Sequence, residues 1–132
     1  MSLEVGMYVR GKYYAYRGKI GKIIKNYNND LEIAYTNGIL KTTVGSFLDD
    51  NTDINGRQYV ASFNIIDILE ARDILVDDSN DKLEVLLIDD ELMVRNTGLI
   101  YDNNYYLPIK SITIKSVITH EQMEQMAYKV GE

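Results

Sequence analysis

The chain has 132 residues, of which 45% are hydrophobic and 26% are charged, and its net charge at pH 7 is −6. This composition is typical of a folded protein of one domain or two very small ones, and the apolar content excludes a disordered chain. The chain has no cysteine and a single histidine, His120, which excludes disulfide scaffolds and zinc sites built from thiolates. Few side chains therefore remain for reaction chemistry.

The charge is distributed unevenly along the sequence. Residues 1–44 carry a net charge of +4, whereas residues 45–132 carry −10. A chain whose two parts have opposite charges can orient a partner electrostatically. No apolar run approaches the roughly 18 residues that a membrane-spanning helix needs, and residues 1–10 lack the basic and apolar regions of a signal peptide. We therefore expect a cytoplasmic protein without a membrane segment.

Alternating apolar and polar residues predict short β-strands in the first part of the chain. The first strand spans residues 4–10, residues 13–16 are expected to be extended, and the second strand spans residues 19–25. Gly21 marks a bulge or a close approach of two backbones within the second strand.

Two turns follow the second strand. Residues 28–30 are Asn-Asn-Asp, a turn composition, and residues 31–35 alternate again as a strand. Asn37 and Gly38 form the strongest hairpin signal in the chain, because both residue types tolerate the positive φ of a type I′ turn. Residues 39–44 are then predicted to form the returning strand.

A polar stretch divides the chain. Residues 46–58 predict a loop between two modules. Beyond it, an apolar segment at 61–69 precedes expected strands at 73–76, 83–88, 91–95, 99–101, 105–107 and 109–118. Thr119 and Gln122 have the spacing of a capping box, which predicts one short helix over residues 120–127.

The expected fold is mainly β, with one or two small SH3-like barrels and one short C-terminal helix. The predicted modules are residues 1–48 and residues 60–132, joined by a loop at 49–59, and a single β domain over residues 1–132 is the alternative. Two modules of roughly 60 residues are marginal alone, so we expect them to pack together.

Acidic residues gather in predicted turns without forming a recognisable reaction site. Residues 51–56 match part of a calcium-binding loop, but Asn51 occupies its first position and Ser62 its twelfth, where a bidentate glutamate is needed. His120 has no second ligand in the sequence and is expected to be an exposed residue of the first helical turn. The sequence therefore predicts no catalytic residue, no metal site, no cofactor and no enzymatic activity.

A basic, tyrosine-rich segment supplies the candidate binding residues. They are Arg10, Lys12, Tyr14, Tyr16, Arg17, Lys19, Lys22 and Lys25. Cationic side chains contact phosphates and aromatic rings stack on bases, so this mixture is typical of barrels that bind single-stranded nucleic acid. The alternative is an ordinary strand face of solvated lysines and cross-strand tyrosines. The negative charge of the remaining chain opposes binding to a phosphate backbone.

Tyrosines on a small β scaffold also suit a protein partner, because tyrosine offers a large contact area at a low entropic cost. The acidic turns suit a basic groove of another protein, where they would mimic a phosphate backbone.

Three segments carry a resemblance to a known family. They are residues 5–10 (VGMYVR), residues 62–70 (SFNIIDILE) and residues 119–130, which begin THEQM and end YKV. Together they resemble small uncharacterised proteins of phages and prophages from low-GC Gram-positive bacteria, in which VGMYVR, NIIDLIE-x-GD and TKEQF…YKV occur in this order. The chain departs from the pattern at residues 71–73, Ala-Arg-Asp, where a Gly-Asp turn is usual.

The resemblance implies a phage accessory protein in the cytoplasm of a bacterial host, and it supplies no functional residues. The leading hypothesis is a non-enzymatic module that binds a host or phage protein, such as a component of a host defence system. The alternative hypothesis is a nucleic-acid-binding module of SH3-like or OB-like type that uses the basic segment.

Overall fold

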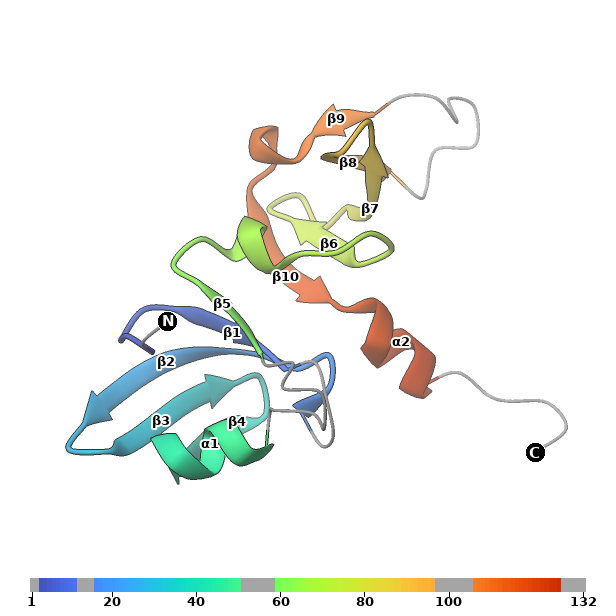
Figure 1. Cartoon of the computed structure of the whole chain (residues 1–132). Coiled ribbons are helices and arrows are strands. Elements are labelled where there is room, and N and C mark those ends of the chain that lie inside the picture. The colour runs from blue at the N-terminus through green and yellow to red at the C-terminus, as the bar shows by residue number, and fades with distance from the viewer. Residues whose placement is uncertain (1–2, 12–15, 51–58, 97–105, 127–132) are drawn as a thin grey trace, which may run out of the picture. The chain divides into compact units, whose positions relative to one another are not determined.

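The computed structural model describes residues 3–11, 16–50, 59–96 and 106–126. The chain divides into two compact units, Met1–Ile68 and Leu69–Glu132. Each unit contains one antiparallel five-stranded sheet (Figure 1). The prediction of a mainly β fold is thereby confirmed. The SH3-like barrels are not confirmed, because each sheet keeps two edge strands within the described residues and neither sheet closes.

The first unit is built from local hairpins. Its elements are β1 (Tyr8–Arg10), β2 (Ile20–Tyr27), β3 (Asp30–Tyr35), β4 (Gly38–Thr43), α1 (Val44–Asp50), β5 (Val60–Ser62) and the 3₁₀ turn η2 (Ile65–Ile68). The strand order in the sheet is β4-β3-β2-β1-β5. The long β2 therefore lies in the centre, and the predicted strands at 4–10, 19–25, 31–35 and 39–44 all have counterparts.

Two tight turns join β2, β3 and β4, and the second of them differs from the prediction. Asn28 and Asn29, between β2 and β3, have φ of 53° and 70°, the backbone of a two-residue primed turn. In the next hairpin Tyr35 pairs with Gly38, so the loop residues are Thr36 and Asn37. Of the residues in this turn, only Gly38 has a positive φ, at 146°. The predicted type I′ turn centred on Asn37 and Gly38 is therefore wrong: the loop lies one residue earlier, and neither Thr36 nor Asn37 has the positive φ of that turn type.

One face of the first sheet packs into a hydrophobic core. Val9, Ile23, Leu31 and Ile33 alternate with outward-facing neighbours and are at most 1% exposed. Gly21 lies on the same face, and a Cβ there would come 2.5 Å from the Ile33 Cγ2 atom. The side chains of Ile33 and Tyr35, and not a second backbone, thus occupy the space beside Gly21, and the register shift in β2 lies between Ile23 and Lys25.

The helix α1 was not predicted from the sequence. The Thr43 Oγ1 atom accepts a hydrogen bond from the Ser46 backbone N at 3.1 Å and caps the first turn. Phe47, one turn along, is 2% exposed and its ring centroid lies 5.3 Å from that of Tyr59. Burial raises the pKa of the Tyr59 hydroxyl. The predicted polar loop therefore begins with a helix that delivers a phenylalanine to the core.

The boundary between the units lies later than predicted. β5 pairs antiparallel with β1, so residues 60–68 belong to the first unit and not to the predicted module 60–132. Residues 13–15 of the expected extended segment, the predicted strand at 99–101 and most of the loop at 49–59 lie outside the described residues.

The second unit contains a meander whose first strand also pairs with the last strand of the unit. Its elements are β6 (Ile74–Asp77), β7 (Lys82–Ile88), β8 (Glu91–Asn96), β9 (Leu107–Pro108), the 3₁₀ turn η3 (Ile109–Ser111), β10 (Ile114–Ile118) and α2 (His120–Met126). The order is β10-β6-β7-β8-β9, so the last strand pairs with the first. Leu75, Val85 and Val94 are at most 1% exposed and form the centre of its core.

The predicted strand at 109–118 is shorter in the structure, whereas the predicted helix after it begins as expected. The expected ten-residue strand at 109–118 opens with η3, and only Ile114–Ile118 pairs as β10. The capping box is confirmed: the Gln122 backbone N donates to Thr119 Oγ1 at 3.2 Å, and the Thr119 backbone N donates to Gln122 Oε1 at 3.1 Å. This reciprocal pair starts the predicted C-terminal helix at His120.

The turn before β6 holds a strained residue. Arg72 has a φ of 76°, a region that glycine adopts freely and that costs an L side chain about 1 kcal/mol or more. Its backbone N donates to the Val85 carbonyl at 2.7 Å, which fixes this conformation. We expect Arg72→Gly to raise the free energy of unfolding by about 1 kcal/mol in urea denaturation. Arg72→Ala is the control, because it keeps the Cβ atom and should give no gain; equal gains would contradict this account.

Candidate functional site

The face of the first sheet opposite its core is the main candidate binding surface, here named the outer face. It carries Tyr8, Lys22, Lys25, Tyr27, Asp30, Glu32, Ala34, Ile39, Lys41, Thr43 and Ser62. These residues share a face because directly paired residues on neighbouring strands project to the same side. One row across the sheet is Ser62, Tyr8, Lys22, Ala34 and Ile39, and the next is Lys25, Glu32 and Lys41.

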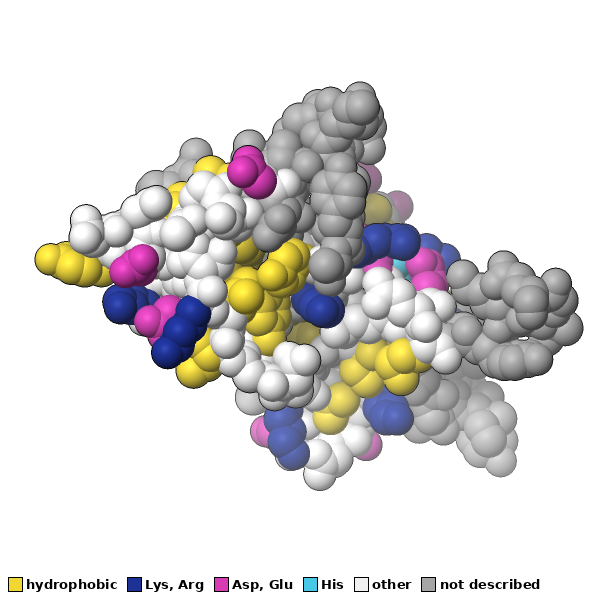
Figure 2. Space-filling view, turned by 90° about the horizontal axis from the view of Figure 1, so that it is seen from below, with side chains coloured by type: hydrophobic (Ala, Val, Ile, Leu, Met, Phe, Trp, Pro, Cys, Tyr) yellow, Lys and Arg dark blue, Asp and Glu magenta, His cyan; other side chains and the backbone are white. Residues whose placement is uncertain are grey.

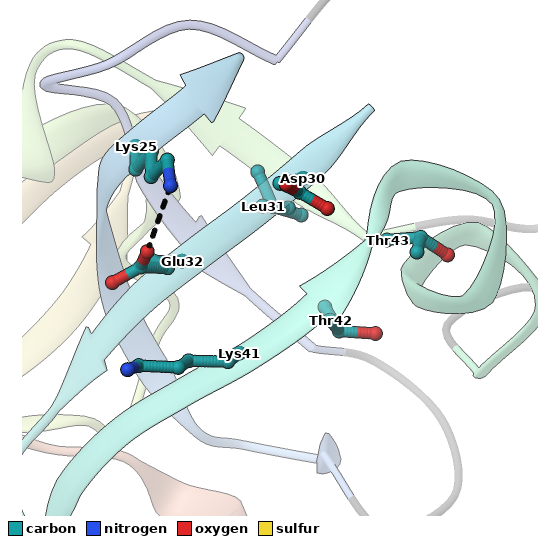
Figure 3. Close-up of a pocket in the computed structure, with 7 residues that line it drawn as sticks. All are labelled: Lys25, Asp30, Leu31, Glu32, Lys41, Thr42 and Thr43. Atoms are coloured by element: carbon teal, nitrogen blue, oxygen red, sulfur yellow. Dashed lines mark ion pairs between the residues drawn. The ribbon is translucent and has the colours of Figure 1, made fainter. Parts of the chain in front are cut away.

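Charges of both signs alternate on the outer face. The Lys25 Nζ atom lies 3.5 Å from Glu32 Oε2, as the dashed line in Figure 3 marks, and Lys41 is the partner of Glu32 on β4. These three residues line an open hollow together with Asp30 and Thr43. An alternating arrangement of this kind can recognise an equally mixed surface by complementarity.

Large apolar side chains accompany these charges. Tyr27 is 74% exposed and Ile39 is 56% exposed. Lys22 places its Nζ atom 5.4 Å from the centroid of the Tyr8 ring, within the range of a cation–π contact. Figure 2 shows hydrophobic side chains reaching the surface beside lysine or arginine and acidic side chains.

The predicted binding residues do not share one surface. Lys22 and Lys25 lie on the outer face, whereas Lys12 and Tyr14 lie outside the described residues. Arg10 is 0% exposed, and its Nη1 atom donates to the Ile68 carbonyl at 3.0 Å. Arg10 is therefore a buried structural residue and cannot reach a partner on the surface.

Tyr16 and Lys19 lie on the other side of the sheet. The Tyr16 ring stacks on Tyr35 with a centroid separation of 6.1 Å, and Lys19 Nζ lies 5.9 Å from the Tyr16 centroid. Burial raises the pKa of the Tyr35 hydroxyl, and the neighbouring Tyr16 raises it further. Arg17, which is exposed, forms an isolated bridge with Gly11. The basic segment is thus divided between two faces.

A second group of side chains lies in the second unit around His120. The His120 Nε2 atom is 2.9 Å from Glu70 Oε1 and 3.4 Å from Glu121 Oε1. The His120 side chain is 18% exposed, so the prediction of an exposed histidine without a second ligand is wrong. β10 pairs with β6 such that Ile118 lies opposite Ile74, which brings Glu70 to His120 across fifty residues of sequence.

No protein-family model, no curated protein and no solved structure matches this chain. Among the described residues, no helix has both the length and the apolar character that a membrane crossing requires. The function is therefore inferred from the described side chains.

Proposed function

We propose that the chain is a non-enzymatic protein-binding module, an accessory protein of a phage or prophage that acts in the cytoplasm of its bacterial host. Its partner is a host or phage protein, with a component of a host defence system as one candidate. The observation that carries the proposal is the outer face, where the exposed Ile39 and Tyr27 flank the alternating charges of Lys25, Glu32 and Lys41. Exposed apolar anchors with charged neighbours are typical of protein interfaces.

The position of Glu32 favours a protein partner over nucleic acid. Glu32 lies between two lysines of neighbouring strands, and Asp30 lies on the same face. A carboxylate in the middle of the surface repels phosphate groups, which carry most of the affinity for nucleic acid. The burial of Arg10 removes a further cation from the predicted surface.

Nucleic-acid binding is the second candidate, favoured by the contacts of Lys22 with Tyr8 and of Lys19 with Tyr16. Proteins that bind single-stranded nucleic acid place cationic side chains beside aromatic rings in this way. These two pairs lie on different faces of the sheet.

Site-specific crosslinking tests the protein-binding proposal. A photoreactive residue at position 39 should label one partner protein in the host cell, whereas the same residue at Leu87, which is 57% exposed in the second unit, should not. Ile39→Glu should then weaken binding of the purified partner at least about tenfold, because it places a charge in a desolvated contact. Leu87→Glu is the matched control. Equal labelling at both positions, or equal affinities for both variants, would remove the outer face as the binding site.

Fluorescence anisotropy with labelled oligonucleotides tests the second candidate. We expect no binding at low salt. A salt-dependent signal that Lys22→Glu abolishes and Lys82→Glu preserves would instead favour nucleic acid, because each lost phosphate contact reduces the salt dependence. Lys82 is an exposed lysine of the second unit and serves as the charge-matched control.

A further inference from the structure

Three potential metal ligands converge in the second unit. One ligand atom from each of Glu70, His120 and Glu121 lies within 4.8 Å of the other two. The side chains of Glu121, His120 and Glu70 are 4%, 18% and 32% exposed, so Glu121 is buried and the other two are partly buried. Buried carboxylates occur where their charge is paired or where they coordinate a metal. We propose that these three residues bind a divalent transition-metal ion of the zinc type.

The separations between the ligand atoms suit such an ion. In a tetrahedral site with bonds of about 2.0–2.1 Å, neighbouring ligand atoms lie about 3.3–3.4 Å apart. The His120 Nε2 atom is 3.4 Å from Glu121 Oε1 and 2.9 Å from Glu70 Oε1. One oxygen is already at the required separation, and the other needs a shift of about half an ångström. An imidazole Nε2–H donates fully to one oxygen only, whereas a metal ion bonds to both.

The other nitrogen of His120 has the environment of a metal ligand. Metal-bound histidines usually donate their second ring N–H to a carboxylate, which fixes the tautomer and the orientation of the ring. The His120 Nδ1 atom has no hydrogen-bond partner among the described residues, and Glu124 Oε1 lies 3.8 Å from it. A metal bound at Nε2 would leave the Nδ1 atom on the side of the Glu124 carboxylate.

Asp73 holds the two chain segments that supply the ligands. Its side chain is fully buried; Oδ2 accepts a hydrogen bond from the Glu70 backbone N at 2.8 Å, and Oδ1 accepts one from the His120 backbone N at 2.9 Å. The capping box at Thr119 fixes the start of α2, which carries Glu121. The ligands are thus positioned by the backbone, which reduces the entropic cost of binding a metal.

A hollow lies beside His120. Arg72, Ile74, Glu84, Met123 and Glu124 line it together with His120. Three protein ligands leave a fourth tetrahedral position for water. A site with one imidazole and two carboxylates favours zinc-type ions over magnesium and calcium, which prefer oxygen ligands only.

Zinc titration of the untagged chain tests the site. Because the sequence has one histidine and no cysteine, no other imidazole or thiolate competes for the ion. We expect saturable 1:1 binding of ZnCl₂ in calorimetry, with proton release, and no comparable binding of MgCl₂. In NMR spectra the imidazole signals of His120 should shift on addition of zinc.

Two isosteric variants locate the ion. Glu70→Gln and Glu121→Gln should each weaken zinc binding at least about tenfold, since an amide oxygen is a poorer ligand than a carboxylate. Glu91→Gln removes the same charge at the exposed first residue of β8 and should leave the affinity unchanged. Circular dichroism checks that each variant is folded.

Two results would overturn the assignment. The first is zinc that leaves the His120 signals of the unmodified chain in place, a measurement that does not depend on any variant folding. The second is a zinc affinity that Glu70→Gln and Glu121→Gln reduce no more than Glu91→Gln does.

Discussion

Phe47→Ala should lower the free energy of unfolding by about 3–5 kcal/mol, the range for a phenylalanine removed from a packed core. Phe47 is 2% exposed, lies in the core of the first unit and packs against Tyr59. Alanine leaves a cavity, because the surrounding core side chains relax only partly into the space of the lost ring. Urea denaturation followed by circular dichroism measures the change.

The chain contains its own control for this substitution. Its only other phenylalanine, Phe63, is 57% exposed. Phe63→Ala removes the same atoms from a largely solvated position and should cost about 0.5 kcal/mol or less. Similar losses for both variants would falsify the assignment of Phe47 to the core.

Asp73→Ala should cost about 3 kcal/mol. The substitution removes the acceptor that the fully buried Asp73 side chain provides to two part-buried backbone N–H groups, those of Glu70 and His120. Each unsatisfied buried donor costs about 1–3 kcal/mol. The loss should be visible both as a lower urea midpoint and as faster amide hydrogen exchange at the start of α2.

Asp77 provides the comparison for Asp73. Its Oδ1 atom also accepts hydrogen bonds from two backbone N–H groups, those of Ser79 and Asp81, but at an exposed turn. Water replaces the lost acceptor there, so Asp77→Ala should cost about 1 kcal/mol or less. If the two variants lost the same stability, burial would not be the reason for the effect at Asp73.

The strands were predictable because their alternation is a local signal. Buried residues occupy every second position in β2 (Gly21 and Ile23), β3 (Leu31 and Ile33) and β7 (Leu83 and Val85), and asparagine or aspartate fills the tight turns. The helix α1 was not, because Val44–Asp50 is short, has a glycine in its first turn and contributes one buried residue, Phe47. Val44, Phe47 and Leu48 have helical spacing, but a segment of two turns is too short to distinguish this pattern from a strand or a loop.

The candidate sites depend on pairing, which local patterns do not encode. In the sequence, Arg10 is one of several cations in the basic segment. In the structure it is buried, and the carbonyl of Ile68 in η2 accepts its hydrogen bond. Glu70 and His120 meet only because β10 returns to β6. The proposed metal ligands could therefore be found from the sequence only if the pairing of β10 with β6 were predicted first.

The order of strands along the chain has a consequence for synthesis on the ribosome. Every strand of the first sheet has its partner once Ser62 has been added, whereas β6 waits for β10 at residues 114–118. Domains generally fold as units while translation proceeds at about 5–20 residues per second. The first sheet can therefore mature during elongation, but the second must remain incomplete until residues 114–118 have been added.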